Sequence, residues 1–206
     1  INIGKGEDME LRRLSVEQIV ELYDRHLKYD FPEDELKPIG RITDMYDRGV
    51  YFAAGMYDEE NVLRAYAYFV HDAVEKTVLL DYFAVVRGNR DKGYGSKFWE
   101  NAGAFLKEYD IDRLYLETEN VDFAKDDEDM NTRIRRIAFY KKNGLTMTDV
   151  RSMLFGVNYN IMMLELNKDN DATGISDTDT VRQQLKNIYN IMFEEEKFKD
   201  KVIIYE

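Results

Sequence analysis

The segment from residue 51 to residue 109 constrains the fold of this 206-residue chain more than any other. Three runs rich in apolar and aromatic residues follow one another across short polar turns, which predicts an antiparallel meander with strands at 51–57, 63–71 and 77–86. A loop with two glycines comes directly after the third run. Apolar residues at helical spacing then predict a helix over about 93–109. We therefore expect a mixed α/β domain in which helices cover one sheet.

The rest of the chain adds elements to this sheet. Ser15 and Gln18 have the spacing of a capping box, which marks a helix start. We expect the acidic segment 121–131 to be a loop. The other predicted elements are helices over 15–28, 39–48, 133–143 and 181–192 and strands over 112–119, 145–150 and 158–166. The expected fold class is a mixed α/β fold with a mostly antiparallel sheet flanked by helices and a C-terminal helical extension.

Composition divides the chain into four parts. Residues 9–167 hold the predicted sheet and read as one domain. Residues 168–178 have the composition of a linker, and 179–206 form the predicted helical extension. That extension is a packed appendage, a lid or a dimer element, so the chain is expected to be a monomer or a homodimer. We expect residues 1–8 to be a disordered start or a remnant of cloning.

The charge balance limits the partners. The chain carries 29 basic and 41 acidic residues, for a formal net charge of −12. An acidic surface argues against nucleic acid and against an anionic membrane as partners. There is no cysteine, which excludes disulfides and thiolate chemistry. No apolar run approaches the roughly 18 residues of a membrane helix, so we expect a soluble cytoplasmic protein.

We also expect no metal site. His26 and His71 lie far apart in the sequence. Asp169–Gly174 is similar to the start of a calcium-binding loop, but its twelfth position is Thr180, where that loop needs a bidentate glutamate.

One segment is basic, although the chain as a whole is acidic. Between Val85 and Lys97 there are four basic residues and the single acid Asp91. The segment joins a predicted strand to a predicted helix, where unpaired N–H groups and the helix dipole favour an anion. Gly93 and Gly95 allow the backbone to approach a phosphate closely. The spacing does not fit a P-loop, and a dinucleotide fingerprint needs glycine where Phe98 stands. A plain strand-to-helix turn is the alternative to an anion site.

The stretch Arg90-Asp91-Lys92-Gly93-Tyr94-Gly95 resembles the acetyl-CoA pyrophosphate loop Q/R-x-x-G-x-G/A of the GNAT superfamily of N-acetyltransferases. A second stretch, Arg136–Leu145, resembles the later helix of the same superfamily, which ends F/L-Y-x-x-x-G-F, with Leu145 in place of the usual phenylalanine. The two stretches are about 50 residues apart and follow the order of the family. The resemblance covers 9–166 and implies a GNAT fold with acetyl-CoA as cosubstrate.

The resemblance also implies the CoA-binding residues. The main chains of Val85 and Arg87, with Val86 between them, would polarise the acetyl carbonyl and hold the pantetheine arm. The residues that would wrap the pyrophosphate are Arg90, Asp91, Lys92, Gly93, Tyr94, Gly95 and Ser96. The side chains of Arg90 and Lys92 would meet either the 3′-phosphate or solvent. From the later helix the implied contacts are Arg133, which replaces a frequent family asparagine, Arg136, Phe139 and Tyr140.

The implied reaction is direct acetyl transfer to an amine in a ternary complex. Tyr140 is the implied proton donor to the leaving thiolate, and a core aromatic is the alternative. The attacking amine must be neutral, so a base is needed. Asp81 and Glu117, both on predicted strands, are the candidates for the base or for amine recognition. Each is alternatively a solvated acid, or an ion-pair partner of an arginine in 133–136.

The acceptor is expected to be an amine on a small molecule, a peptide or a protein. The net charge favours a cationic acceptor. The acidic segment Asp126–Asp129 would attract such an amine, or is simply solvated. The rival function is a non-catalytic acyl-CoA-binding or protein-interaction module on the same fold. The presence of Tyr140, Asp81 and Glu117 favours an enzyme.

Overall fold

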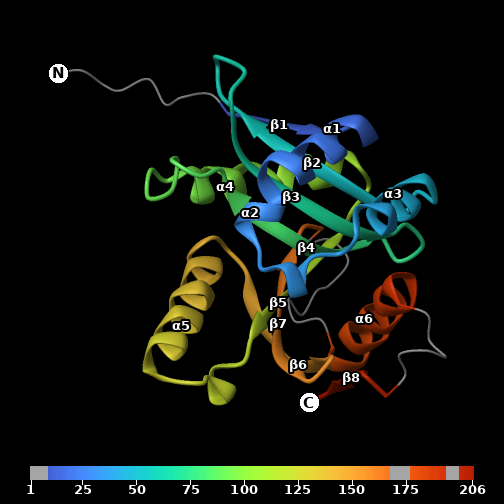
Figure 1. Ribbon diagram of the computed structural model, residues 1–206. Helices are drawn as coiled ribbons and strands as arrows, with labels where there is room; N and C mark the ends of the chain where they lie inside the picture. The colour runs from blue at the N-terminus through green and yellow to red at the C-terminus, as the bar shows by residue number, and fades with distance from the viewer. Residues whose placement is uncertain (1–8, 168–176, 194–199) are drawn as a thin grey trace. The chain divides into compact units, whose positions relative to one another are not determined.

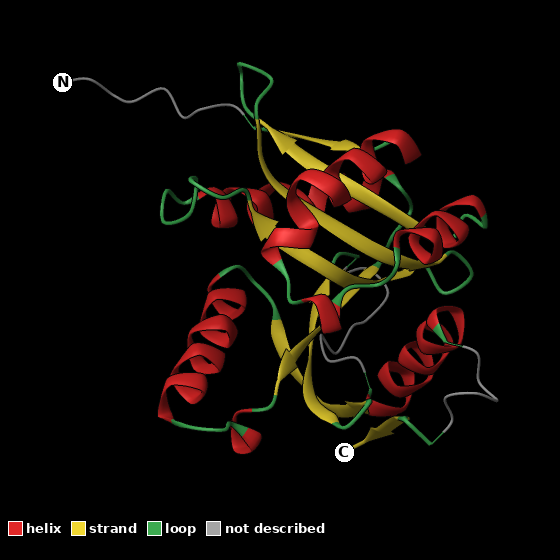
Figure 2. Ribbon diagram, viewed as in Figure 1, coloured by secondary structure: helices red, strands yellow, loops and turns green. Residues whose placement is uncertain are grey.

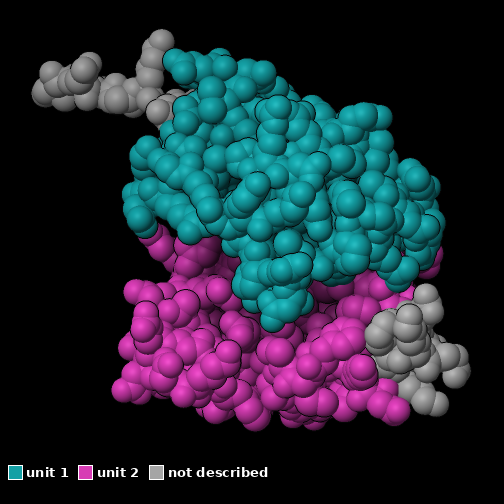
Figure 3. All heavy atoms as spheres, in the orientation of Figure 1, with its two compact units in different colours: residues 1–69, 81–108 teal, residues 70–80, 109–206 magenta. Residues whose placement is uncertain are grey.

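A computed structural model describes residues 9–167, 177–193 and 200–206. The chain forms two compact units, which are coloured separately in Figure 3. The first unit is Ile1–Phe69 with Asp81–Glu108, and the second is Val70–Leu80 with Tyr109–Glu206. The eight strands of the described residues are hydrogen-bonded in the order β1-β2-β3-β4-β5-β7-β6-β8.

The first unit holds four strands and four α-helices. The strands are β1 (Glu10–Arg13), β2 (Tyr51–Tyr57), most of β3 (Leu63–Asp72) and the end of β4 (Thr77–Val85). The helices are α1 (Val16–Leu22), α2 (Lys28–Asp30), α3 (Ile39–Asp47) and α4 (Tyr94–Glu108). A π-helical turn, η1 (Tyr23–Leu27), joins α1 to α2, and a 3₁₀ turn, η2 (Glu33–Glu35), follows them. Helices α1 and α3 lie on one face of these strands and α4 lies on the other (Figure 2).

Local chemistry explains these elements. The hydroxyl of Ser15 accepts from the N–H of Gln18, and the Gln18 side chain accepts from the N–H of Ser15 at 2.9 Å, so the predicted capping box is confirmed. Phe52 and Phe69 stack across β2 and β3 with ring centroids 5.0 Å apart. Phe98 of α4 is fully buried, with its ring centroid 4.9 Å from that of Phe83 on β4. Helix α4, which follows the glycine loop, is therefore fixed to β4 by aromatic packing.

The second unit contains the remaining elements. Its strands are β5 (Arg113–Glu119), β6 (Thr146–Leu154), β7 (Val157–Glu165) and β8 (Val202–Tyr205), and its helices are η3 (Val121–Phe123), α5 (Asp127–Lys142) and α6 (Thr178–Met192). The start of β4 pairs with β5 in parallel, from Thr77 opposite Arg113 to Leu80 opposite Leu116. The pairs β5–β7, β6–β7 and β6–β8 are antiparallel. Helices α5 and α6 lie on opposite sides of these strands (Figure 1).

The predicted fold class is confirmed, because helices flank a mixed and mostly antiparallel sheet. The loop prediction over 121–131 is wrong from Asp127, where α5 begins. The side chain of Asp126 caps this helix by accepting from the N–H of Asp129 at 2.8 Å. Acids in a first helical turn are also stabilised by the helix dipole, so an acidic run can start a helix.

The two outermost strands were not predicted. Strand β1 pairs with β2, and β8 pairs with β6, so the C-terminal extension contains a strand as well as a helix. Helix α6 and β8 belong to the same compact unit as β5 to β7. Residues 1–8 and most of the predicted linker, 168–176, lie outside the described residues. The predicted domain boundaries stay predictions.

Candidate functional site

The predicted anion-binding loop joins β4 to α4 in the first unit. Its backbone has positive φ angles of 82°, 63° and 82° at Gly88, Asp91 and Gly93. The N–H of Lys97 donates to the carbonyl of Gly93 at 3.1 Å, which is the first hydrogen bond of α4. The N–H groups of residues 93–96 therefore come too early in the helix to bond to one of its own carbonyls. A Cβ added at Gly93 would meet no atom within 4 Å. An open approach to a helix N-terminus suits a phosphate group, which is what the predicted pyrophosphate contact requires.

A buried carboxylate ties the basic side chains of this loop to α2. The side chain of Asp30 is only 1% exposed. Its Oδ1 accepts from Nε of Arg87 and from a terminal nitrogen of Arg90, both at 3.1 Å. The hydroxyl of Tyr66 donates to its Oδ2 at 2.7 Å. The side chains of Arg87 and Arg90 are 61% and 57% exposed, so each is held at one edge and remains accessible to a ligand.

Some main-chain groups at the end of β4 are hydrogen-bonded within the protein. The N–H of Val86 donates to the carbonyl of Arg64 at 2.9 Å, and its carbonyl accepts from the N–H of Asn89 at 3.0 Å. The guanidinium of Arg64 also donates to the side chain of Asn89 at 3.1 Å. Val86 therefore braces the loop, whereas Val85 and Arg87 stay the predicted main-chain contacts to CoA.

The remaining loop residues differ in exposure. They are Asp91, Lys92 and Gly93, which are exposed, Gly95 and Ser96, which are half-buried, and Tyr94, which is buried. The ring of Tyr94 is close to two cations, with its centroid 5.4 Å from the guanidinium of Arg64 and 5.4 Å from the ammonium of Lys97. Tyr94 can thus reach a ligand only through its main chain. The ammonium of Lys92 donates to the carbonyl of Gly88 at 2.8 Å, which closes the loop on itself.

Asp81 lies on β4 in the same unit, four residues before Val85. Its side chain is 7% exposed, and its Oδ1 is 2.5 Å from the ammonium of Lys37. The hydroxyl of Tyr51 donates to its Oδ2. Burial, together with the charge of Asp81, raises the pKa of Tyr51 well above its ordinary value, so this phenol stays a donor. Asp81 is therefore a buried, paired carboxylate, and its partner is Lys37 rather than an arginine of 133–136.

The segment that carries Lys37 is fixed through its backbone. The N–H of Lys37 donates to the hydroxyl of Tyr82 at 2.8 Å, and this hydroxyl donates to the carbonyl of Glu35 at 2.8 Å. The carbonyl of Lys37 accepts from the hydroxyl of Tyr23 at 3.0 Å. Strand β4 thus positions Lys37 through Tyr82 as well as through Asp81.

Sequence reasoning missed three residues of this unit, Asp30, Lys37 and Tyr51. Their contacts join positions between 30 and 60 residues apart, which no local pattern reveals. One signal was available for Lys37, which is the single basic residue within the acidic stretch FPEDELKP.

Glu117 lies on β5 in the second unit and contacts α6. The hydroxyl of Tyr189 on α6 donates to its carboxylate. The hydroxyl of Ser152 is 3.3 Å from that carboxylate and 3.0 Å from the oxygen of Tyr189. The hydroxyl of Tyr115, on the same strand, donates to the side chain of Gln184 on α6 at 2.6 Å. Helix α6 is thus packed on β5 through a buried polar network that includes Glu117, as the packed-appendage alternative expects.

Tyr189→Phe is expected to lower the free energy of unfolding by about 1–3 kcal/mol, because the carboxylate of Glu117 loses a buried donor. Urea unfolding followed by circular dichroism measures this loss. Tyr29→Phe is the matched control, since the side chain of Tyr29 is 60% exposed. Equal and negligible losses in both variants would contradict the role of the network.

Two arginines of α5 have acidic partners. The guanidinium of Arg133 donates to the carbonyl of Asn120 at 2.6 Å and pairs with Asp129 and Glu119 at 3.0 and 3.2 Å. Arg133 is buried, so these partners occupy a residue that was predicted to bind CoA. Arg136 pairs with Glu119 at 3.3 Å, but its side chain is 49% exposed and remains accessible.

Tyr140 lies near the end of α5 and is 8% exposed. Its ring packs edge-on against the half-buried Phe139, with ring centroids 5.3 Å apart. Its carbonyl accepts from the N–H groups of Asn143 and Leu145 at 3.0 and 3.1 Å, which closes the end of the helix. Burial raises the pKa of the phenol to about 12, and the charge of Arg136 opposes this rise. At neutral pH the phenol therefore carries the proton that a general acid needs.

The raised pKa of Tyr140 predicts a loss of stability in alkali. The phenol of the unfolded chain ionises near pH 10, whereas in the folded protein its pKa is about 12. The stabilising contribution is thus fully present below pH 10 and is lost as the pH rises towards 12. We expect the wild type to lose on the order of 2 kcal/mol more than Tyr140→Phe across this window. Urea unfolding at successive pH values measures the difference, and parallel curves would contradict it.

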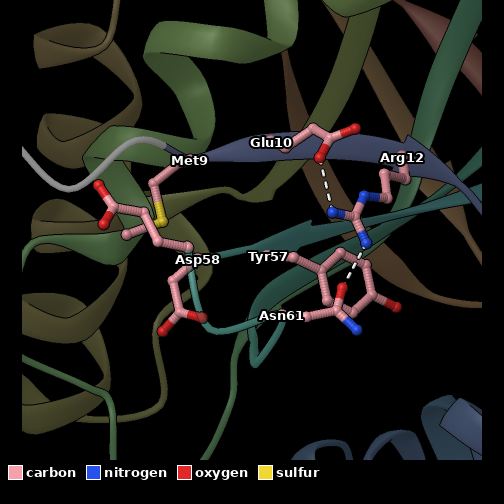
Figure 4. Close-up of a pocket in the computed structure, with 7 residues that line it drawn as sticks. Met9, Glu10, Arg12, Tyr57, Asp58 and Asn61 are labelled. Atoms are coloured by element: carbon pink, nitrogen blue, oxygen red, sulfur yellow. Dashed lines mark hydrogen bonds and ion pairs between the residues drawn. The ribbon is translucent and has the colours of Figure 1, made fainter.

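A surface pocket of about 380 Å³ lies beside β1 and the turn between β2 and β3 (Figure 4). Arg12 crosses it, donating to Glu10 at 2.6 Å and to Asn61, with its guanidinium 4.9 Å from the centroid of the Tyr57 ring. The full lining is Met9, Glu10, Arg12, Tyr57, Asp58, Glu59 and Asn61. None of the predicted site residues lines this pocket, so we assign no substrate to it.

Membrane-spanning helices and metal-binding groups are absent from the described residues. None of their helices combines the length and apolar character of a membrane span. They contain no group of three or more histidine, aspartate or glutamate residues placed to hold a metal ion. The calcium-like stretch Asp169–Gly174 lies outside the residues that the structure describes.

The sequence matches the model of the acetyltransferase (GNAT) family over residues 16–145, more than half of the chain. The chain belongs to this family and is an acetyl-CoA-dependent acyltransferase. A search of curated proteins gave no match.

Solved structures of GNAT acetyltransferases share this fold. A protein of Bacteroides thetaiotaomicron assigned to the GNAT family is 18% identical with a TM-score of 0.66, covering 87% of this chain and 97% of its own. The spermidine N-acetyltransferase of Vibrio cholerae, solved with CoA and spermine, is 10% identical with a TM-score of 0.54, covering 79% and 98%. The ribosomal-protein-S18-alanine N-acetyltransferase of Escherichia coli is 15% identical with a TM-score of 0.55, covering 82% and 100%. At these identities the likeness shows the fold alone, and it confirms the predicted GNAT fold.

Proposed function

We propose that this protein transfers the acetyl group of acetyl-CoA to a primary amine by direct attack in a ternary complex. The observation that carries the proposal is the loop of the first unit, where the open Gly93 directly precedes the start of α4, an arrangement that suits an anion. Two arginines braced by the buried Asp30 border that loop. A site of this kind suits the pyrophosphate of CoA, the donor substrate of the family.

The binding roles follow from the exposure of each group. The main-chain N–H groups of residues 93–96 would hold the pyrophosphate. Arg87 and Arg90 would add charge from the edge of the loop, because Asp30 fixes only one side of each guanidinium. Arg136, which is half exposed, is the better candidate on α5 for a CoA phosphate, since Arg133 is buried among its partners. The main chains of Val85 and Arg87 would orient the donor arm.

The proposed acetyl transfer needs one group that donates a proton to the sulfur and one group that binds the attacking amine. Acetyl-CoA supplies the activated thioester carbonyl. Tyr140 would donate a proton to the departing sulfur, a role that its protonated phenol supports. Asp81 is favoured over Glu117 as the group that receives the amine, because Asp81 lies on the strand that leads into the CoA loop. Glu117 is hydrogen-bonded within the α6 network.

The acceptor is proposed to be a cationic aliphatic amine. The formal charge of −12 favours cations in general, and Asp81 already binds an ammonium group. Two structural neighbours act on different amines, spermidine in one case and the alanine of ribosomal protein S18 in the other. A panel containing spermidine and a peptide with N-terminal alanine would separate polyamine from protein acceptors. Since acetyl-CoA is an intracellular metabolite, we propose a cytoplasmic activity.

Isothermal titration with acetyl-CoA, CoA and ATP tests the donor half of the proposal. We expect both CoA species to bind and ATP to bind far more weakly, because the loop would be shaped for the extended CoA pyrophosphate. Initial rates with both substrates varied then test direct transfer. Intersecting double-reciprocal lines are expected for a ternary complex, and parallel lines would indicate an acetyl-enzyme instead. No binding of either CoA species to the folded protein would overturn the proposal.

A further inference from the structure

The carboxylate of Asp81 has one oxygen available for an ammonium group, and the ammonium of Lys37 occupies that position. The hydroxyl of Tyr51, which is fully buried, fixes Oδ2 of the carboxylate. Oδ1 is left for the ammonium of Lys37 at 2.5 Å. The ring centroid of Tyr82 is 5.4 Å from that ammonium, and Phe31 packs edge-on against the same ring at 5.0 Å. A desolvated carboxylate beside an aromatic face is a favourable environment for a small cation.

The two sides of this carboxylate differ in access. The side chain of Lys37 is 20% exposed, whereas Tyr51 is fully buried. Oδ1 therefore faces a side chain that reaches solvent, whereas Oδ2 faces one that does not. The site also lies on the strand that continues into the CoA loop. Val85, one of the proposed main-chain contacts to the donor, lies four residues further along β4.

We propose that the Oδ1 side of Asp81 recognises the primary ammonium group of the acceptor, and that Lys37 is an internal occupant which the acceptor displaces. This inference rests on the proposed acetyltransferase function. Lys37 delivers its ammonium on an unbranched four-carbon chain. The class of acceptor is accordingly an unbranched alkylammonium, such as an aliphatic polyamine or a lysine side chain.

The test removes the occupant and supplies it again as a free molecule. Lys37→Ala deletes three carbons and the nitrogen, which n-propylammonium replaces. The first readout is the melting temperature in n-propylammonium chloride, compared with the same concentration of sodium chloride or of neutral n-propanol. The second is N-propylacetamide formed from acetyl-CoA, measured by mass spectrometry. Its formation makes the amide C–N bond and breaks the C–S bond. Of two protons lost by the ammonium, one ends on the CoA sulfur and one in solvent.

We expect n-propylammonium, but not n-propanol, to raise the melting temperature of Lys37→Ala and to leave that of the wild type unchanged. We expect Lys37→Ala to form N-propylacetamide at least about tenfold faster than the wild type at the same amine concentration, because Lys37 no longer fills the site. Lys37→Arg, which keeps a cation in place, should behave as the wild type.

The variant Lys37→Ala leaves a buried carboxylate without its cation and is expected to be destabilised. Lys37→Met with Asp81→Asn removes both charges and keeps the volume, so it provides a folded control that should neither bind n-propylammonium nor acetylate it. CoA titration of each variant separates the two proposals. If n-propylammonium stabilises Lys37→Ala but a CoA-bound enzyme never acetylates it, Lys37 and Asp81 form a structural pair and this inference fails. If neither the wild type nor any variant binds CoA, the proposed function is wrong, and the inference about Lys37 is then wrong as well.

Discussion

Gly93→Asp is expected to weaken the binding of CoA by at least about 100-fold, which corresponds to roughly 2.7 kcal/mol. Two causes act together. Gly93 has a φ of 82°, which an L side chain rarely adopts, so the loop would have to distort. The new carboxylate would also stand at the start of α4, where the pyrophosphate is proposed to bind, and like charges repel there. Isothermal titration with CoA gives the ratio of dissociation constants.

Gly49→Asp is the matched control for this variant. Gly49 follows α3, has a φ of 74°, and has no atom within 4 Å of an added Cβ, so it imposes comparable backbone strain and the same charge change. We expect the two variants to lose similar stability and only Gly93→Asp to lose affinity for CoA. Equal affinities in both variants would show that CoA does not bind at the loop.

Tyr140→Phe is expected to lower kcat by about 100- to 10,000-fold while the affinity for CoA stays close to that of the wild type. The phenol is the proton donor proposed for the departing sulfur, and phenylalanine keeps the ring but has no proton to give. Steady-state kinetics with thiol detection measures kcat, and titration measures affinity. A proportional loss of both would assign Tyr140 to binding rather than to proton transfer.

Tyr115→Phe is the control for the chemistry of a buried phenol. Tyr115 is fully buried, and burial raises its pKa to about 12, the same value as that of Tyr140. Its hydroxyl donates to Gln184 rather than serving the reaction. We expect this variant to lose stability and to keep kcat. An equal loss of kcat in both variants would mean that any buried tyrosine deletion disturbs the fold enough to stop turnover.

The sequence predicted the local features of this protein well. Strands β2 to β5 were evident because their apolar runs are bounded by turns, and α4 because its buried face repeats at helical spacing. The glycine loop was predictable for a similar reason, since its strand, glycines and helix are contiguous. One local pattern gave a wrong prediction. The acidic run at Asp127 suggested a loop, although acids are favourable in the first turn of a helix, and α5 begins there.

The sequence could not reveal contacts between distant segments. Strand β1 has only four residues, reads ELRR, and is defined by its pairing with β2 rather than by a pattern of its own. Asp30 and Lys37 look like ordinary surface charges until the fold brings them to Arg90 and Asp81, 60 and 44 residues away. The same limit applies to Glu117, whose partner Tyr189 is 72 residues further along the chain.

The most direct test of the central claim is the stoichiometry of acetyl transfer. The wild type is incubated with acetyl-CoA and the amine panel, and released thiol and acetylated amine are measured in the same samples. We predict one acetylated amine for every thiol released, at a rate that depends on both substrates. CoA binding without thiol release, or thiol release without any acetylated amine, would contradict the account and leave an acyl-CoA-binding protein or a thioesterase in its place.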